Sequence, residues 1–170
     1  MIKLYAVGDI ALCGGYTSML PIKGPDFPFS SIVPYFRQGD IVFGNLEVPL
    51  SQKGLPDKSK PLSFCGPPQG IDALASAGFT HISMANNHAY DYGSEALMDT
   101  QNRLIKSGIE TMGAGIDLAG ARKPAVSSFG NCMVAFLAYN SYTTNGRGYA
   151  DKTRGGVSPL EYKYVSSDIK

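Results

Sequence analysis

Short apolar runs alternate along the chain with segments whose apolar residues recur at the spacing of a helix. Runs rich in β-branched and aromatic residues predict strands at 2–7, 40–43, 79–84 and 109–112. Apolar positions three, four and seven residues apart predict helices over 69–77 and 93–107. Strands that alternate with helices in this way indicate an α/β sheet with helices packed on its faces.

Glycine, proline and polar residues mark the segments between these elements. The predicted loops are 13–28, 51–61 and 140–158. A short helix capped by Ser30 or Ser31 is expected to end at Phe36. Segments 125–128 and 133–138 predict a β-hairpin.

The composition is typical of one globular domain. The chain has 170 residues, of which 44% are hydrophobic and 17% are charged, a balance that argues against disorder. The formal net charge is +1, so there is no electrostatic basis for expecting nucleic acid or an anionic membrane as a partner.

The sequence also bears on the compartment. No apolar run reaches the roughly 18 residues of a spanning helix, and the first strand leaves no room for a signal peptide. The cysteines, Cys13, Cys65 and Cys132, are odd in number and far apart, which favours reduced thiols over a zinc site. We expect a cytoplasmic protein as the chain stands, or an extracytoplasmic one if an upstream leader or anchor is missing.

Polar side chains follow three consecutive predicted strands. Asp9 follows the first, Asn45 and Glu47 follow the second, and Asn87 and His88 follow the third. Each has a structural explanation when it is taken alone, as a turn, cap or packing residue. Ligands of open α/β sheets bind beyond the carboxyl ends of the strands, so the three strand ends together predict one shared site.

These residue types suit a divalent metal ion. The candidate metal ligands are Asp9, Asn45, Glu47 and Asn87. Carboxylate and amide oxygens are hard ligands, and Asn45 and Glu47, two residues apart, face the same way in an extended segment. The candidate catalytic residues are His88 and Asp91, because Asp91 is placed to orient the imidazole. His81 lies within a predicted strand and is expected to be a structural or a surface residue.

Three motifs resemble, in order and spacing, those of the CapA (poly-γ-glutamate capsule biosynthesis) family. They are Gly8-Asp9, Asn45-Leu46-Glu47-Val48-Pro49 and Ala85-Asn86-Asn87-His88-Ala89-Tyr90-Asp91-Tyr92-Gly93. That family is similar to the calcineurin-like metallophosphoesterases. The resemblance implies a layered α/β sandwich, with residues 1–170 forming the N-terminal part of a domain that is truncated at its C-terminal side.

The resemblance also implies a reaction. By position, Asp9 would bind one metal ion and Asn87 a second, with Mn, Fe or Zn as the cofactor. Two such ions would polarise a phosphoryl or carbonyl group, and His88 would stabilise developing charge or protonate the leaving oxygen.

The sequence departs from the metallophosphoesterase pattern at several positions. Ala11 replaces a histidine expected after the first strand, and Asn45 replaces a bridging aspartate, which leaves Glu47 as the nearest carboxylate. The histidines expected in the C-terminal half are absent, since His81 and His88 are the only two in the sequence. We therefore expect weak metal binding.

The segment 140–158 is a second candidate region. Its charged and aromatic residues include Tyr142, Arg147, Tyr149, Lys152 and Arg154. Arg147 and Arg154 are the candidate substrate-binding residues, for an anionic polymer or a phosphoester. An ordinary solvated loop is the preferred interpretation, given the low net charge.

Three functions remain open. The first is a metal-dependent, phosphoesterase-like hydrolase, and the second is a non-catalytic component of capsule assembly that binds the polymer. The third is a truncated domain without activity, in which an unpaired sheet edge favours homo-oligomers.

Overall fold

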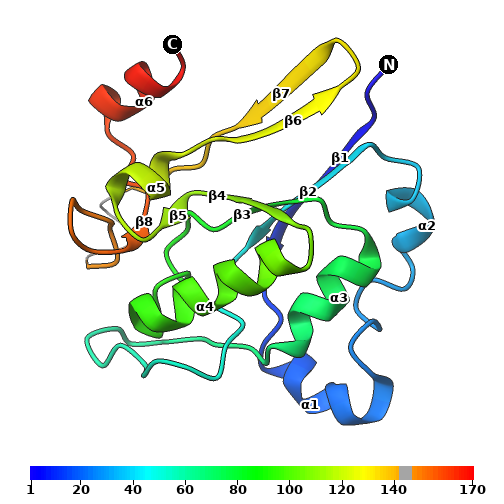
Figure 1. The fold of residues 1–170 in the computed structure, drawn as a ribbon. Helices are drawn as coiled ribbons and strands as arrows, with labels where there is room; N and C mark the ends of the chain where they lie inside the picture. Colours follow the sequence, from blue (N-terminus) through cyan, green and yellow to red (C-terminus); the bar gives the residue numbers. More distant parts are fainter. Residues whose placement is uncertain (142–146) are drawn as a thin grey trace.

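The computed structural model describes residues 1–141 and 147–170, and its centre is a four-stranded parallel sheet. The strands lie in the order β1 (Leu4–Ile10), β2 (Ile41–Leu46), β3 (His81–Ser83) and β4 (Glu110–Met112). All three pairings are parallel. This sheet, with helices connecting its strands, confirms the predicted α/β class (Figure 1).

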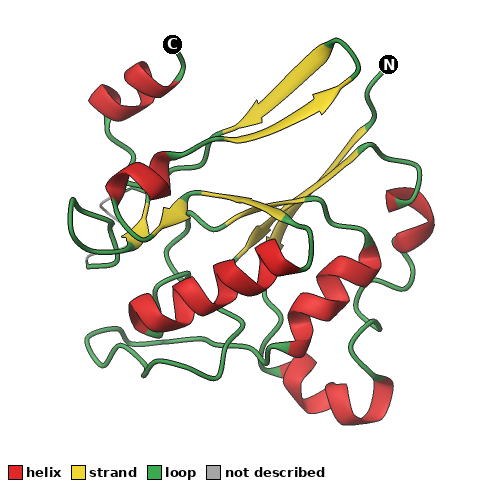
Figure 2. Cartoon of the chain, in the orientation of Figure 1, coloured by secondary structure: helices red, strands yellow, loops and turns green. Residues whose placement is uncertain are grey.

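The sheet separates two layers. Helices α3 (Gln69–Ala77) and α4 (Gly93–Lys106) lie on one side, and the hairpin of β6 (Ala125–Phe129) and β7 (Cys132–Phe136) lies on the other (Figure 1 and Figure 2). Apolar side chains from sheet and helices form the core on the helical side. Its fully buried members include Leu74, Ile82, Leu97 and Leu104. The two long helices and the hairpin were therefore predicted correctly.

The hairpin covers the opposite face through aromatic and histidine contacts. The ring of Phe136 stacks on Phe43 with centroids 5.5 Å apart and lies 4.8 Å from the ring of His81. His81 is 2% exposed, and its ring nitrogens form 2.8 Å hydrogen bonds with Thr80 and Ser127. Burial lowers the pKa of His81, so the neutral ring is favoured. Of the two alternatives expected for His81, the structural one is confirmed.

The loop predicted for residues 13–28 is wrong over half its length. Helix α1 (Gly15–Lys23) forms there although Pro21 lies inside it. Tyr16 is buried and its ring stacks on Phe27 at 5.7 Å, so tertiary packing outweighs the weak local propensity. The next helix, α2 (Val33–Phe36), ends where predicted but has no side-chain cap, since the Ser30 hydroxyl donates to the carbonyl of Phe27.

The polar segment near the C-terminus is also more ordered than a solvated loop. Strand β8 (Gly156–Val157) pairs antiparallel with β5 (Ala114–Gly115), and Tyr149 is buried beside it. The solvated-loop interpretation is therefore wrong for Tyr149 and for β8, whereas Lys152 and Arg154 are exposed, and Tyr142 lies outside the described residues.

Two short helices were missed. Helix α5 (Leu118–Arg122) begins at Asp117, whose carboxylate accepts a 2.7 Å hydrogen bond from the Gly120 amide. Helix α6 (Tyr162–Asp168) is attached to it by an ion pair of 2.5 Å between Arg122 and Asp168.

Strand β1 is at one edge of the sheet. Self-association through an open sheet edge remains a prediction. None of the helices in the described ranges combines the length and apolarity that a membrane crossing requires.

The hydrogen bonds and the ion pair of Asp99, a residue of α4, provide a first test of the fold. Asp99 accepts hydrogen bonds from Ser51 at 2.7 Å and Arg103 at 2.9 Å, and its other oxygen lies 3.1 Å from the Lys53 ammonium. Burial alone would raise the pKa of Asp99, but these donors outweigh it and lower the pKa from 3.8 to about 2.

The folded-state pKa lies below the unfolded value, so the stabilisation is present above pH 4 and is lost as the pH falls toward 2. Asp99→Asn should cost about 2 kcal/mol at pH 7 and flatten the stability profile over that acid range. Urea denaturation at several pH values measures both effects. The exposed Glu95 on the same helix supplies the control Glu95→Gln, and equal losses in the two variants would refute a specific role for Asp99.

Candidate functional site

A hydrogen-bond network joins the ends of β1, β2 and β3. The side-chain nitrogen of Asn45 donates to Asp9 Oδ1 at 2.8 Å and to Glu47 Oε2 at 2.9 Å. The side-chain oxygen of Asn45 in turn accepts from the side-chain nitrogen of Asn86 at 3.1 Å. The structure therefore brings together three of the four predicted metal-ligating residues, and it places Asn87 in the adjoining turn.

The local backbone of β1 explains how Asp9 reaches Asn45. Ala6 is opposite Phe43, yet Asp9 rather than Gly8 is opposite Asn45, so β1 contains one extra residue. A bulge of this kind turns the following side chains to the other face of the strand. The predicted end of the first strand before Gly8 was too early, because Gly8 and Asp9 lie within β1.

Asn86 connects the second strand to the turn that contains His88. Its amide nitrogen also donates to the Leu46 carbonyl at 2.8 Å. Its side-chain oxygen accepts from the backbone amides of His88 at 3.0 Å and Ala89 at 2.8 Å. Asn86 is 7% exposed and its side chain joins the end of β2 to the backbone of the turn, so we assign it a role in shaping the turn.

His88 and Asp91 form the dyad that the sequence predicts. The Nδ1 atom of His88 lies 2.7 Å from Asp91 Oδ2, and Asp91 is 0% exposed. An ionised carboxylate only accepts hydrogen bonds, so Nδ1 carries the proton and Nε2 is the nitrogen left for other chemistry. The Phe64 ring packs edge-on against the imidazole at 5.1 Å between centroids.

Two further residues hold Asp91, and sequence reasoning missed both. The Lys60 ammonium forms an ion pair with Asp91 and donates to the Asn87 carbonyl at 2.5 Å. The Phe64 backbone amide donates to Asp91 Oδ2 at 2.8 Å. Lys60 belongs to a segment predicted as a surface loop, and no local pattern indicates a contact with a residue 31 positions away.

The electrostatics of the two carboxylates indicate unbalanced negative charge. Burial raises the pKa of Glu47 and the nearby Asp9 carboxylate raises it further, whereas His88 and the Asn45 hydrogen bond lower it. Within the described residues, neither Asp9 nor Glu47 forms an ion pair with a lysine or arginine. Asn86, which hydrogen-bonds to both Asn45 and the His88 backbone amide, joins the carboxylates and the dyad in one site.

The cluster offers few ligands to a metal ion. Asp9 and Glu47 offer two carboxylates that share a single neutral amide group as donor. The nitrogen of Asn45, rather than its oxygen, faces them, so this amide competes with a cation as the side chain stands. Over residues 1–141 and 147–170 there is no group of three or more His, Cys, Asp or Glu side chains placed to hold a metal.

The two predicted substrate-binding arginines differ in position. Hydrogen bonds from Ser59 chiefly lower the pKa of Asp57, and Arg147 lowers it further, which places Arg147 near the loop that contains Lys60. Arg154 is held in its own turn, where it pairs with Asp151 at 3.5 Å and donates to the Tyr149 carbonyl. Substrate binding remains a prediction for both arginines.

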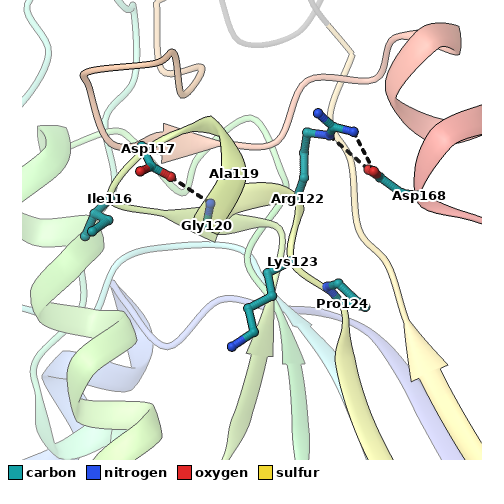
Figure 3. A pocket seen from close by; sticks show the side chains of 8 residues that line it. All are labelled: Ile116, Asp117, Ala119, Gly120, Arg122, Lys123, Pro124 and Asp168. Carbon is teal, nitrogen blue, oxygen red and sulfur yellow. Dashed lines mark hydrogen bonds and ion pairs between the residues drawn. The ribbon is translucent and has the colours of Figure 1, made fainter.

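An open pocket of about 630 Å³ lies elsewhere, around α5 (Figure 3). Three of its charged side chains are already engaged, since Arg122 pairs with Asp168 and Asp117 caps α5. None of the predicted site residues lines it.

Comparisons with known proteins cover almost the whole chain. The model of a family described as bacterial capsule synthesis protein PGA_cap matches residues 3–169. The PGA biosynthesis protein CapA of Bacillus subtilis (strain 168) is 31% identical over 158 residues, which are 91% of this chain and 41% of that protein. The capsule biosynthesis protein CapA of Bacillus anthracis is 26% identical over 155 residues, which are 89% of this chain and 38% of that protein.

A third relative is a probable polyglutamine synthesis accessory protein of Mycobacterium tuberculosis (strain ATCC 25618 / H37Rv). It is 34% identical over 92 residues, which are 54% of this chain and 24% of that protein. The chain thus spans about two fifths of the length of the two CapA relatives.

Lys60 provides a test of how the dyad is held. Lys60→Met leaves the fully buried Asp91 without its cationic partner, and we expect a loss of about 3 kcal/mol in the free energy of unfolding. The double variant Lys60→Met/Asp91→Asn should recover part of this loss because no buried charge remains. Chemical denaturation of the parent and the variants measures both.

Lys58→Met is the matched control, since Lys58 is exposed in the same loop and should change stability by less than about 0.5 kcal/mol. If Lys60→Met is as stable as Lys58→Met, the ion pair with Asp91 does not hold the dyad in solution.

Proposed function

The chain belongs to the bacterial capsule synthesis protein family PGA_cap, and from this premise we propose that it acts in poly-γ-glutamate capsule synthesis through a metal-assisted hydrolytic site. The names of three relatives, which refer to PGA biosynthesis, capsule biosynthesis and polyglutamine synthesis, support the biological role. The observation that carries the chemical part is the proximity of the His88–Asp91 dyad to the Asp9–Asn45–Glu47 cluster.

His88 is the proton-transfer group of the proposed site. Asp91 fixes the proton on Nδ1, so Nε2 is free to hold a proton or to give one to a leaving oxygen. Lys60 and the Phe64 amide hold the Asp91 carboxylate in place and thereby keep the imidazole in one orientation. The substrate class that fits this arrangement is a phosphoester or the amide linkage of an anionic polymer.

Asp9 and Glu47 are the residues that would hold a divalent cation. When bound, such an ion supplies Lewis-acid polarisation of a phosphoryl or carbonyl oxygen and lowers the pKa of bound water. Without a cation, the two carboxylates would weaken the binding of a polyanionic substrate, because like charges repel.

A second candidate function is binding of the polymer without catalysis. It is favoured by one observation, the neutral amide of Asn45 between the two carboxylates, which satisfies both of them without any metal. Arg147, near the loop that contains Lys60, would then contact the carboxylates of the polymer.

Titration with Mn²⁺ separates the two functions. We expect weak, saturable binding by the parent, loss of binding in Asp9→Ala, and roughly tenfold tighter binding in Asn45→Asp, where a third carboxylate replaces the amide. Isothermal titration calorimetry gives the affinities. Asn45→Asp should also lower stability in chelator and regain it with Mn²⁺, because three carboxylates then repel one another.

His88→Ala is the control that distinguishes binding from turnover. It should retain Mn²⁺ affinity while losing Mn²⁺-dependent cleavage of a generic phosphodiester by at least roughly a hundredfold. Saturable binding of poly-γ-glutamate that is unaffected by Mn²⁺ or chelator, with no cleavage, would reject the hydrolytic proposal and favour the polymer-binding one.

A further inference from the structure

Two of the three cysteines lie in loops that meet beside the candidate site. Cys13 follows β1, the strand that contains Asp9, and Cys65 directly follows Phe64, which contacts the dyad. We propose that Cys13 and Cys65 form a reversible disulfide bond that ties these two loops together. This proposal does not depend on metal binding or on hydrolysis.

Backbone packing brings the two loops into contact. Gly66, next to Cys65, lies so close to Leu12, next to Cys13, that a Cβ atom on Gly66 would fall 2.0 Å from the Leu12 carbonyl oxygen. Disulfides need Cα atoms roughly 4.4–6.8 Å apart, a range that adjoining residues of two touching backbones can meet. The direct contact between the neighbouring residues is the geometric basis of the proposal.

The thiols themselves are consistent with this placement. Both are free and only partly buried, and the Cys65 thiol donates to the Ser51 carbonyl at 3.3 Å. Burial raises the pKa of Cys65, and the charge of Cys13 raises it further. Cys132, at the start of β7, is exposed and serves as an internal reference.

A bond between these sulfurs would act on the dyad through Phe64. The Phe64 amide donates to Asp91 and its ring packs against His88, so a shift of Cys65 moves the adjoining contacts. Forming the bond also removes the hydrogen bond from Cys65 to Ser51. Oxidation is therefore expected to change the environment of the His88 ring.

The chemistry is ordinary thiol–disulfide exchange with a small disulfide such as oxidised glutathione. One cysteine thiolate attacks the small disulfide, forming a mixed disulfide and releasing one glutathione thiolate. The second cysteine thiolate then displaces the other glutathione. The two cysteines lose two electrons and two protons, and the oxidant is reduced to two thiols. Because burial raises the pKa of both cysteines, exchange should be slower than at Cys132 and faster at alkaline pH.

Peptide mapping tests the bond directly. The Cys132→Ser variant is equilibrated with oxidised glutathione at alkaline pH, alkylated, digested and analysed by mass spectrometry. We expect a linked peptide containing Cys13 and Cys65, no free thiol, and a melting temperature roughly 5–15 °C above that of the reduced protein. The parent protein is treated in parallel as a reference. Full conversion of its exposed Cys132 to a mixed disulfide with glutathione shows that the oxidation is complete.

Cys13→Ser in the same background should give neither the linked peptide nor the rise in melting temperature. If conditions that fully convert Cys132 leave Cys13 and Cys65 free, or give each its own glutathione, the proposed disulfide is wrong.

Nuclear magnetic resonance of the His88 ring tests the coupling to the site. Its signals should shift on oxidation of the Cys132→Ser variant and should not shift when Cys13 is also replaced by Ser. A linked peptide with unchanged His88 signals would overturn the proposed coupling to the dyad.

Discussion

The extra residue in β1 is the constraint on which the site depends. In a regular parallel ladder that begins with Ala6 opposite Phe43, Gly8 would be opposite Asn45 and Asp9 would point to the other face of the sheet. The bulge instead places Asp9 opposite Asn45, where the 2.8 Å hydrogen bond forms. The Glu47 amide then donates to the Ile10 carbonyl, which extends the β1–β2 ladder to the second carboxylate. One irregularity in the backbone thus fixes the geometry of two acidic side chains.

Asp91 imposes a second requirement, because a fully buried carboxylate is costly unless it is paired and hydrogen-bonded. Its donors come from His88 in the adjoining turn and from Lys60 and Phe64 in a loop far away in sequence. The Asp57 amide also donates to the Asp91 carbonyl, so the loop is attached by backbone and side chain together. The loop that contains Lys60 and Phe64 is thereby held in place by Asp91, the acidic residue that it helps to bury.

The elements predicted correctly are those whose signal is local and repeated. Helix α4 has a seven-residue apolar repeat, and β2 is a short apolar run that ends at a polar turn, so both appear in the sequence pattern. The polar strand ends were also predictable, because parallel strands bring their carboxyl ends to one edge. Helix α1 could not be predicted in this way, since it depends on Tyr16 packing against Phe27 and overrides Pro21. The cap of α5 by Asp117 is a local signal that could have been found.

The site residues show the same division between local and distant contacts. His88 and Asp91 are three positions apart, so their hydrogen bond follows from the sequence spacing, whereas the ion pair between Lys60 and Asp91 follows only from the fold. The orientation of Asn45 is also a product of the fold. Its oxygen is taken by Asn86, which turns its amide nitrogen toward the carboxylates. Asn45, a residue type that suits metal ligation, therefore acts as a hydrogen-bond donor here. The cause is its contact with Asn86, which lies outside the motif that contains Asn45.

This orientation has a consequence for how metal binding and folding are related. Structural metal sites often fold only when the metal is present, because their ligands repel one another without it. Here the Asn45 side-chain nitrogen donates one hydrogen bond to each of Asp9 and Glu47, which offsets part of the repulsion between the two carboxylates. A cation would have to displace two hydrogen bonds to charged acceptors, each contributing about 1.5–3 kcal/mol, before it gained the attraction of the carboxylates. The same amide that partly offsets the repulsion at the strand ends therefore also lowers their affinity for a cation.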